Sequence, residues 1–340
     1  MDPFRLEGSH LSILDQTVLP REERWIEVRD AQAMVDAISR LRIRGAPAIG
    51  IAAALALAIE AERLTGDASV RFAALKREAA LLRAARPTAA NLAWAVERVL
   101  AVAGREEERG DAQSWAAALR REAIAIWEED RAASRAMARW GASLFRQETR
   151  FMTHCNTGGL ATGGGGTALA VIFELKRTGR DVSVWATETR PLLQGARLTA
   201  WELMRERIPV RLIADGAAAY VMARSCIQGV LVGADRIARN GDVANKVGTL
   251  SLALAAKDRG IPFVVVAPTS TLDSDCRTGA DIPIEERDPM EVLSWQSIAI
   301  APEGVGAENP AFDVTPARLV TAIVTERWIA AGPPFHLGAD

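Results

Sequence analysis

Polar side chains follow several short apolar runs in the second half of the chain, where they could take part in chemistry. Cys155 follows TRFMTH, Glu188 follows DVSVWAT, Asp215 follows VRLIA and Asp235 follows GVLVGA. A thiol and carboxyl groups can both give and take protons in a reaction. Ligands of open α/β sheets bind beyond the carboxyl ends of the strands. We therefore interpret these positions as a candidate site rather than as the routine polar ends of strands.

Cys155 and Asp235 are the two residues of this set on which the chemistry would depend. Each has a structural alternative, because most free cysteines are buried apolar residues and an aspartate can cap a helix. The interpretation as a buried apolar residue also applies to Cys226 and Cys276, which do not lie at a predicted strand end before a helix. His154 precedes Cys155, but neighbours in an extended segment point to opposite sides, so adjacency alone supports no Cys/His dyad.

A glycine-rich segment follows Cys155. The sequence HCNTGGLATGGGGTALAVI lies between a predicted strand and a predicted helix, where backbone N–H groups can cradle an anion. It lacks the lysine of the GxxxxGK[ST] motif, which disfavours nucleotide hydrolysis. A tight strand-to-helix turn is the alternative interpretation, and the glycines alone do not decide between the two.

Two further segments carry cationic side chains just ahead of predicted helices. Arg44 precedes a helix start that contains Pro47, and Asn245 with Lys246 precedes the helix that begins in GTLSLALAAK. Charged side chains and helix-terminal N–H groups together favour a phosphate. A solvated helix start is the alternative for either segment alone, and their combination favours phosphate binding.

We expect neither a metal ion nor another cofactor. The three histidines, His10, His154 and His336, form no HExxH or other ligand spacing, and the three cysteines form no CxxC pair. The odd number of cysteines favours free thiols in a reducing compartment.

Charge and hydropathy restrict the partners. With 41 Lys and Arg against 43 Asp and Glu, the formal net charge is -2, so we expect neither nucleic acid nor an acidic membrane as a partner. The first residues lack the basic and apolar regions of a signal peptide, which predicts a cytoplasmic protein. The apolar stretch 46–59 contains Pro47 and Gly50 and is shorter than a membrane span.

The elements that position these residues fall into two groups. Apolar spacing of three and four residues predicts helices over much of residues 30–145, after a short strand-like piece, WIEVRD. Short β-rich runs then alternate with helical stretches, which predicts a parallel sheet. The runs are TRFMTH, DVSVWATE, VRLIAD, GVLVGAD, PFVVVAP and SIAIAP. The fold class expected is α/β: a mainly helical domain with a small sheet over residues 1–146, and a Rossmann-like domain over 147–340.

Long motifs along the chain resemble methylthioribose-1-phosphate isomerase, a family of methionine salvage enzymes. The resemblance extends from about Leu14 to Arg327. The motifs that carry it are RGAPAIG, ARPTAANLAWAV, THCNTGGLAT, ETRPLLQGARLTAWEL, GADRIARNGDVANKVGT, IPIEER and NPAFDVTP. It implies a homodimer that isomerises 5-methylthioribose 1-phosphate to 5-methylthioribulose 1-phosphate, a small sugar phosphate.

The resemblance also implies roles for individual residues. Cys155 and Asp235 would be the catalytic pair. The substrate would be bound by Arg44, Gly45, Ala46, Arg86, Gln194, Asn245 and Lys246.

The wider family leaves alternatives open. It includes isomerases of 5-deoxyribose 1-phosphate and ribose 1,5-bisphosphate, and non-catalytic regulatory subunits of the translation initiation nucleotide-exchange factor. The sequence after THCNTGGLAT is GGGG, where a bulkier residue is expected, so the 5-substituent of the substrate stays open. The presence of Cys155 and Asp235 favours an enzyme.

Overall fold

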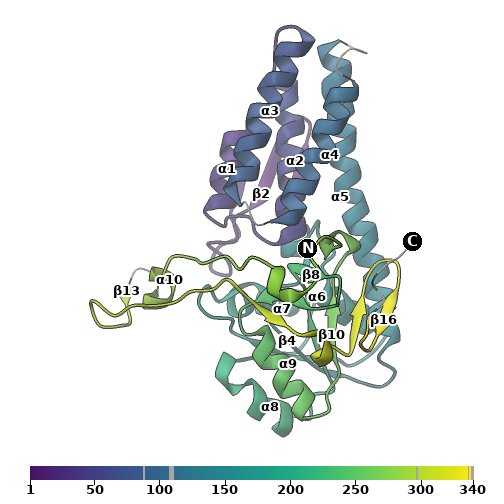
Figure 1. Cartoon of the computed structure of the whole chain (residues 1–340), viewed down its shortest axis with the longest axis vertical. Helices are drawn as coiled ribbons and strands as arrows, with labels where there is room; N and C mark the ends of the chain where they lie inside the picture. Colours follow the sequence, from purple (N-terminus) through teal and green to yellow (C-terminus); the bar gives the residue numbers. More distant parts are fainter. Residues whose placement is uncertain (87–88, 107–110, 296–297, 336, 338–340) are drawn as a thin grey trace. The chain divides into compact units, whose positions relative to one another are not determined.

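A computed structural model describes residues 1–86, 89–106, 111–295, 298–335 and 337 of the chain, with its elements labelled in Figure 1. The chain packs into two compact units: unit 1 comprises Met1–Arg135 and Gly158–Gly166, and unit 2 comprises Ala136–Thr157 and Thr167–Asp340. The division expected between residues 146 and 147 stays a prediction. His336 and two residues of the ARPTAANLAWAV motif, Pro87 and Thr88, lie outside the described residues.

Unit 1 begins with the small sheet that WIEVRD predicts. Its strands are β1 (Phe4–Glu7), β2 (His10–Leu14) and β3 (Trp25–Val28), paired antiparallel in the order β1-β2-β3. Leu11 and Ile13 are fully buried while Ser12 between them is not, so one face of the sheet packs inward.

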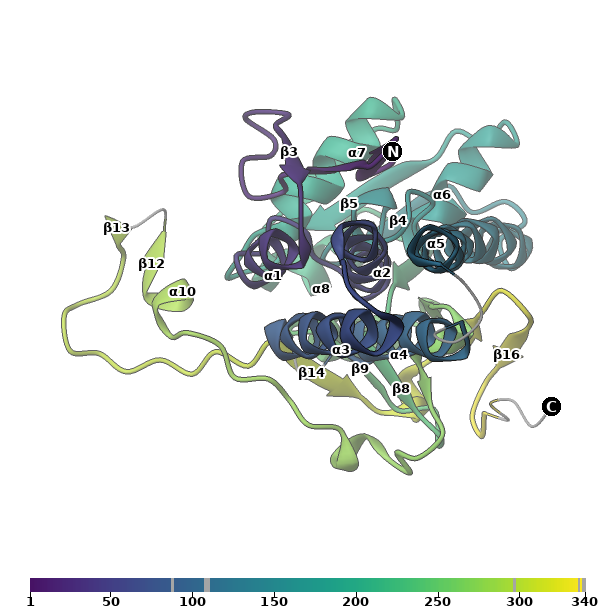
Figure 2. The same cartoon turned by 90° about the horizontal axis from the view of Figure 1, so that it is seen from above.

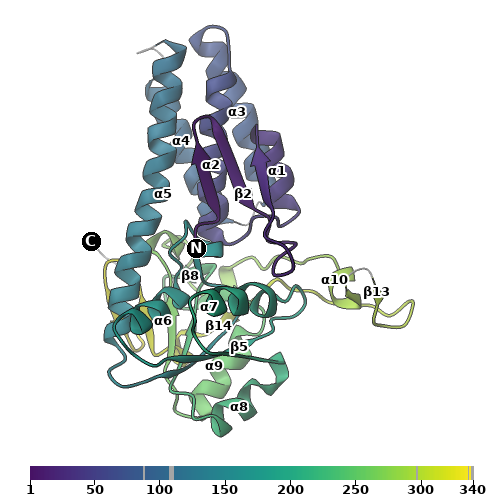
Figure 3. The same cartoon turned by 180° about the vertical axis from the view of Figure 1, so that it is seen from behind.

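The helices predicted over much of residues 30–145 are confirmed. They are α1 (Ala31–Ser39), α2 (Ala46–Arg63), α3 (Ala68–Ala85), α4 (Ala90–Arg105) and α5 (Ala112–Ser143). Figure 2 shows α1, α2 and α5 in one layer and α3 and α4 in a second, and Figure 3 shows the strands alongside α1 and α2. Helix α2 is buried nearly all round, as its continuous apolar sequence requires.

Unit 2 contains the predicted parallel sheet. Its strands are β4 (Arg150–Thr153), β5 (Ser183–Thr187), β6 (Val210–Ile213), β7 (Gly229–Val232), β10 (Phe263–Val266), β15 (Ala322–Val324) and β16 (Ile329–Ala331). The order is β16-β15-β10-β7-β4-β5-β6, and every pairing is parallel except that of β16. The six parallel strands follow the 3-2-1-4-5-6 order of a Rossmann fold, which confirms the predicted fold class.

Both faces of this sheet are covered. The connecting helices are α6 (Ala168–Arg177), α7 (Ala200–Arg205), α8 (Ala218–Arg224) and α9 (Thr249–Asp258). Met152 and Val230 join a core cluster with Met222 of α8 and Leu252 of α9. Side chains alternate along a strand, and Leu231, which points to the opposite face, is also fully buried.

A second, smaller sheet of unit 2 was not expected from the sequence. Its strands are β11 (Leu272–Asp273), β8 (Arg236–Ala238), β9 (Val243–Lys246) and β14 (Phe312–Thr315), in the order β11-β8-β9-β14. The signal was present, because β8 and β9 form a hairpin around Asn240 and Gly241, and Asn-Gly is typical of a tight hairpin turn.

The run SIAIAP was wrongly expected to be a strand of the parallel sheet. Its first residue lies outside the described residues, and Ile298–Ala299 forms β13, which pairs antiparallel with β12 (Ser294–Trp295). The only α-helix described between β11 and β12 is the four-residue α10 (Met290–Leu293), shorter than a usual parallel crossover. Ile298 is 67% exposed, and Figures 1 and 2 show this segment reaching away from the sheet.

Candidate functional site

The predicted catalytic residues lie at the point where the strand order of the large sheet reverses. From β4 the chain continues to β5 and β6 on one side, whereas β7, β10 and β15 follow on the other. Cys155 comes just after β4 and Asp235 just after β7, and these strands pair in parallel with Thr153 opposite Leu231. Ligands of open α/β sheets bind at this switch point. The structure thus brings the two residues to the same edge, as predicted.

Cys155 is buried, and its backbone is held on both sides by threonine hydroxyls. Its φ is +59°, in the left-handed region that non-glycine residues seldom adopt. The Cys155 N–H donates to Oγ1 of Thr189 at 2.9 Å, and its carbonyl accepts from Oγ1 of Thr199 at 2.6 Å. Cys276 is also buried, whereas Cys226 is exposed, so the interpretation of Cys226 as a buried residue was wrong.

Asp235 lies in the turn from β7 to β8 and is partly exposed. Strand β8 begins at the next residue, so the alternative that Asp235 caps a helix was wrong. Its backbone N–H donates to the carbonyl of Ala244 at 2.9 Å. That bond joins Asp235 to the strand that carries Asn245 and Lys246.

Asn245 and Lys246 end β9 with their side chains buried, and they precede helix α9 as expected. The side-chain amide of Asn245 donates to Oγ1 of Thr249 at 3.0 Å. The ammonium group of Lys246 donates to the carbonyl of Ala311 at 2.7 Å and lies 5.0 Å from the ring centre of Phe312. The cation is thereby fixed in place.

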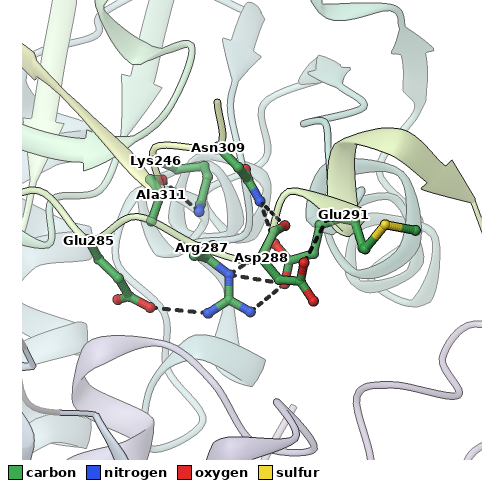
Figure 4. A network of polar contacts seen from close by, with 8 residues as sticks. Lys246, Glu285, Arg287, Asp288, Glu291, Asn309 and Ala311 are labelled. Carbon is green, nitrogen blue, oxygen red and sulfur yellow. Dashed lines mark hydrogen bonds and ion pairs between the residues drawn. The ribbon is translucent and has the colours of Figure 1, made fainter. Parts of the chain in front are cut away.

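A network of ion pairs holds the chain beside Lys246 (Figure 4). The Arg287 guanidinium contacts Glu285 at 3.1 Å and Glu291 at 2.5 Å, and Glu291 also accepts from Asn309 at 3.0 Å. The hydrogen bonds that Arg287 donates to Glu291 raise the pKa of the guanidinium above its ordinary value. The backbone N–H of Ala311 donates to the carbonyl of Glu285, so the network leads to the residue that binds Lys246. Sequence reasoning assigned no role to Arg287.

His154 connects the two halves of the site. Its Nδ1 lies 2.6 Å from Oγ1 of Thr187, and its Nε2 lies 2.8 Å from the carbonyl of Val247. A carbonyl only accepts, so Nε2 carries the proton and Nδ1 accepts from the threonine. Burial lowers the pKa of His154, which keeps the ring neutral. His154 thus holds two segments in position. Both of its ring nitrogens are hydrogen-bonded to these segments, and neither is bound to Cys155.

Gln194 is buried at the start of a π-helical turn, Gly195–Thr199, that leads into α7. Its Oε1 atom has no hydrogen-bond partner among the described residues. A buried carbonyl oxygen left without a donor is costly, and a sugar hydroxyl would satisfy it. Gly195 permits this arrangement, because a Cβ atom there would overlap the Thr187 carbonyl.

The remaining predicted residues belong to unit 1. Arg44 directly precedes Gly45, the residue before α2, and Ala46 is the first residue of the helix. Gly45 has a φ of +98°, and a Cβ atom there would lie 2.5 Å from the carbonyl oxygen of Ala161, so the segment packs closely on the glycine-rich loop. Arg86 follows the last residue of α3, and both arginines are partly buried.

Several N–H groups of the glycine-rich segment already donate to other groups of the protein. Those of Ala161 and Thr162 donate to backbone carbonyls, that of Gly163 donates to Asp130 at 2.7 Å, and that of Gly166 donates to Thr162 Oγ1 at 2.8 Å. These bonds are typical of a tight turn. Asp130, which accepts the N–H of Gly163, belongs to α5, and burial raises the pKa of its carboxyl group to about 6.

Among the described residues, no group of three or more His, Cys, Asp or Glu side chains could hold a metal ion. Metal independence stays a prediction. No helix in the described part of the chain is long and apolar enough to span a membrane. A surface hollow of unit 1, against Ser9, His10 and Glu27, contains none of the predicted site residues.

Comparisons with known proteins give the family. Residues 42–331 match the model of the initiation factor 2 subunit family. The methylthioribose-1-phosphate isomerase of Heliobacterium modesticaldum is 51% identical, over 98% of this chain and 97% of its own.

Two solved structures are also similar over nearly the whole chain. The 5-methylthioribose 1-phosphate isomerase of Pyrococcus horikoshii OT3 superposes with a TM-score of 0.92 at 39% identity, covering 98% of this chain and 93% of its own. The structure described as translation initiation factor eIF-2B subunit delta from A. fulgidus has a TM-score of 0.88 at 40% identity, with coverages of 98% and 96%. The chain therefore belongs to the initiation factor 2 subunit family and, within it, to the methylthioribose-1-phosphate isomerases.

Proposed function

We propose that the protein isomerises 5-methylthioribose 1-phosphate to 5-methylthioribulose 1-phosphate in methionine salvage. The observation that carries this proposal is the placement of Cys155 and Asp235 beyond adjacent parallel strands, where the strand order reverses. The names of the relatives that match over nearly the full chain support the same substrate.

The substrate explains why an acid is needed. Its anomeric oxygen carries phosphate, so the sugar ring cannot open as a free aldose does. Asp235 would protonate the ring oxygen as it leaves C1, in the role of a general acid. A hydrogen must then move from C2 to C1, and Cys155 would relay the proton or support the reacting centre. Retention of a C2 deuterium in the product would indicate hydride transfer, and its loss would indicate proton transfer.

Polar groups of unit 2 would bind the sugar phosphate. Lys246 supplies a fixed cation, Asn245 lies beside it, and the Oε1 atom of Gln194 offers a buried acceptor for a hydroxyl. From unit 1, Arg44, Gly45, Ala46 and Arg86 stay predicted substrate ligands. Binding energy from such groups, remote from the reacting carbons, can orient the substrate for reaction.

A turnover assay with three substrates tests the function. We expect isomerisation of 5-methylthioribose 1-phosphate at a higher kcat/KM than of 5-deoxyribose 1-phosphate or ribose 1,5-bisphosphate. Higher kcat/KM with one of the other sugars would reassign the substrate. No turnover with any of them would favour the non-catalytic alternative, and the similar A. fulgidus structure is described as an eIF-2B subunit.

We further propose a cytoplasmic homodimer that works without a metal ion. The three cysteines are free, which agrees with a reducing compartment. Light scattering of the purified protein tests the dimer. Turnover should survive exhaustive chelation, and a loss that a divalent ion restores would contradict metal independence.

A further inference from the structure

The backbone of Cys155 is in a left-handed conformation that a cysteine seldom adopts by its own preference. Its φ of +59° is typical of glycine, and such conformations persist only where surrounding structure enforces them. The direction of a side chain follows from the backbone of its own residue. The groups that hold this φ therefore also determine the direction of the thiol.

The hydroxyl of Thr189 is one of the two groups that hold it. Thr189 is fully buried, and its Oγ1 accepts the N–H of Cys155 at 2.9 Å. The second group is Thr199, whose hydroxyl donates to the Cys155 carbonyl at 2.6 Å. Both polar atoms of the cysteine backbone are thus bound by side chains rather than by a helix or a strand.

Thr189 is in turn held by a carboxylate. Its own φ is +65°, also left-handed. Asp215, which follows β6, accepts the N–H of Thr189 on Oδ1 at 2.8 Å and the N–H of Arg190 on Oδ2 at 2.7 Å. One carboxylate therefore fixes two successive peptide groups, and hydrogen bonds to a charged acceptor are the stronger kind.

Close packing leaves Thr189 little freedom to move. A Cβ atom on Gly195 would lie 2.9 Å from Thr189 Oγ1, so the π-helical turn packs directly against this hydroxyl. The same turn ends at Thr199, the other residue that binds Cys155. Three consecutive strands, β4, β5 and β6, thus contribute to the placement of one cysteine.

We propose that Thr189, held by Asp215, is a positioning residue that fixes the backbone of Cys155 and with it the direction of the thiol. The inference rests on the proposed role of Cys155 in the isomerisation. It gives a structural role to Asp215, a carboxylate at a strand end that takes no part in the proposed mechanism.

The test compares Thr189→Val and Thr189→Ser with a matched control, Thr325→Val. Valine keeps the shape of threonine but removes the hydroxyl, whereas serine retains it. Thr325 is also fully buried after a strand, and its hydroxyl accepts the backbone N–H groups of Arg327 and Trp328. The control therefore reports the cost of removing a buried threonine hydroxyl away from Cys155.

Two readouts are measured on the full-length protein. For Thr189→Val we expect kcat to fall about 10–100-fold with KM within about twofold, since a small misplacement of a reacting group costs this much. We expect iodoacetamide to alkylate Cys155 several-fold faster, because the loosened backbone exposes a buried thiol. Peptide mass spectrometry quantifies this rate against the exposed Cys226 of the same molecule. Thr189→Ser should restore both values.

Unchanged kcat and alkylation in Thr189→Val, relative to Thr325→Val, would overturn the proposal. If Thr189→Val does not fold, Asp215→Asn takes its place, because the amide can accept only one of the two N–H groups, and the same two readouts apply. Wild-type protein without turnover on any of the three sugar phosphates would refute the proposed function instead. The alkylation rates would still decide whether Thr189 positions Cys155.

Discussion

Nε2 of His154 lies 2.8 Å from the carbonyl oxygen of Val247, so the residue before Cys155 is bound to the residue after Lys246. The predicted thiol and the predicted phosphate ligand are thus connected through a single buried imidazole. The hydrogen bond fixes one tautomer, and burial keeps the ring neutral by lowering its pKa.

This burial predicts a specific dependence of stability on pH. The unfolded histidine takes up a proton near pH 6.5 whereas the folded one does not, so the contribution of His154 is complete above pH 6.5 and is lost as the pH falls below it. We expect the free energy of unfolding in urea to fall less between pH 7.5 and 5.5 in His154→Gln than in wild type. His10→Gln, at an exposed position, is the control and should follow wild type. Equal slopes for all three proteins would contradict the prediction.

Lys246 should contribute to substrate binding through its charge. Charge-assisted hydrogen bonds contribute about 1.5–3 kcal/mol, so we expect Lys246→Met to weaken substrate binding about 10–100-fold. Lys257→Met removes an exposed lysine of the next helix and should change neither KM nor kcat. Steady-state kinetics with melting temperatures measure both variants. A folded Lys246→Met protein with wild-type KM and kcat would remove Lys246 from the site.

The parallel sheet and the helices of the first half could be predicted because their signals are local. Continuous apolar runs identified β4, β5, β6, β7 and β10, and three-to-four residue spacing identified the helices of unit 1. The location of the polar residues at one edge of the sheet could be predicted as well, since the direction of a strand determines at which edge its last residue lies.

Other features depend on contacts between segments far apart in the chain. The hydroxyls of Thr189 and Thr199 bind Cys155 from 34 and 44 residues away, and no local pattern indicates such partners. Strand β15 has only three residues, Ala322–Val324, too short a run to stand out. The run SIAIAP has alternating isoleucines like a strand, but residues 298–300 are exposed, and no crossover that would bring them into the parallel sheet is found among the described residues.

Asp130 should destabilise the folded protein at neutral pH. Burial raises its pKa from 3.8 to about 6, so the folded state holds its proton more tightly than the unfolded state. The protonated carboxyl therefore favours the folded state relative to the ionised one. This gain in the free energy of unfolding is complete below pH 3.8 and is lost as the pH rises through 6. A shift of about two pKa units corresponds to at most about 3 kcal/mol.

Asp130→Asn tests this contribution, because the amide can still accept the N–H of Gly163 but carries no charge. We expect the variant to be more stable than wild type at pH 7.5 and the difference to shrink towards pH 4.5. Asp258→Asn, at an exposed position, is the control. A variant less stable than wild type at pH 7.5 would show that the ionised carboxylate stabilises the turn.

Asp235→Asn gives the most direct test of the mechanism. Asparagine keeps the shape of the side chain but cannot donate a carboxyl proton to the ring oxygen. General acid catalysis contributes about 10²–10⁴-fold, so we expect kcat to fall by that factor. The bond from the Asp235 N–H to Ala244 is a backbone bond and survives the substitution, so the melting temperature should change little.

Substrate affinity separates the catalytic role of Asp235 from a binding role. The groups proposed to bind the substrate lie on other residues, so calorimetry with Asp235→Asn should give a Kd within a few-fold of the wild-type KM. Cys155→Ser serves as the matched comparison, because it changes the other half of the proposed pair and should also lower kcat more than binding. Near-normal kcat in a folded Asp235→Asn protein would refute the general acid. A large loss of affinity with unchanged kcat would instead make Asp235 a substrate ligand.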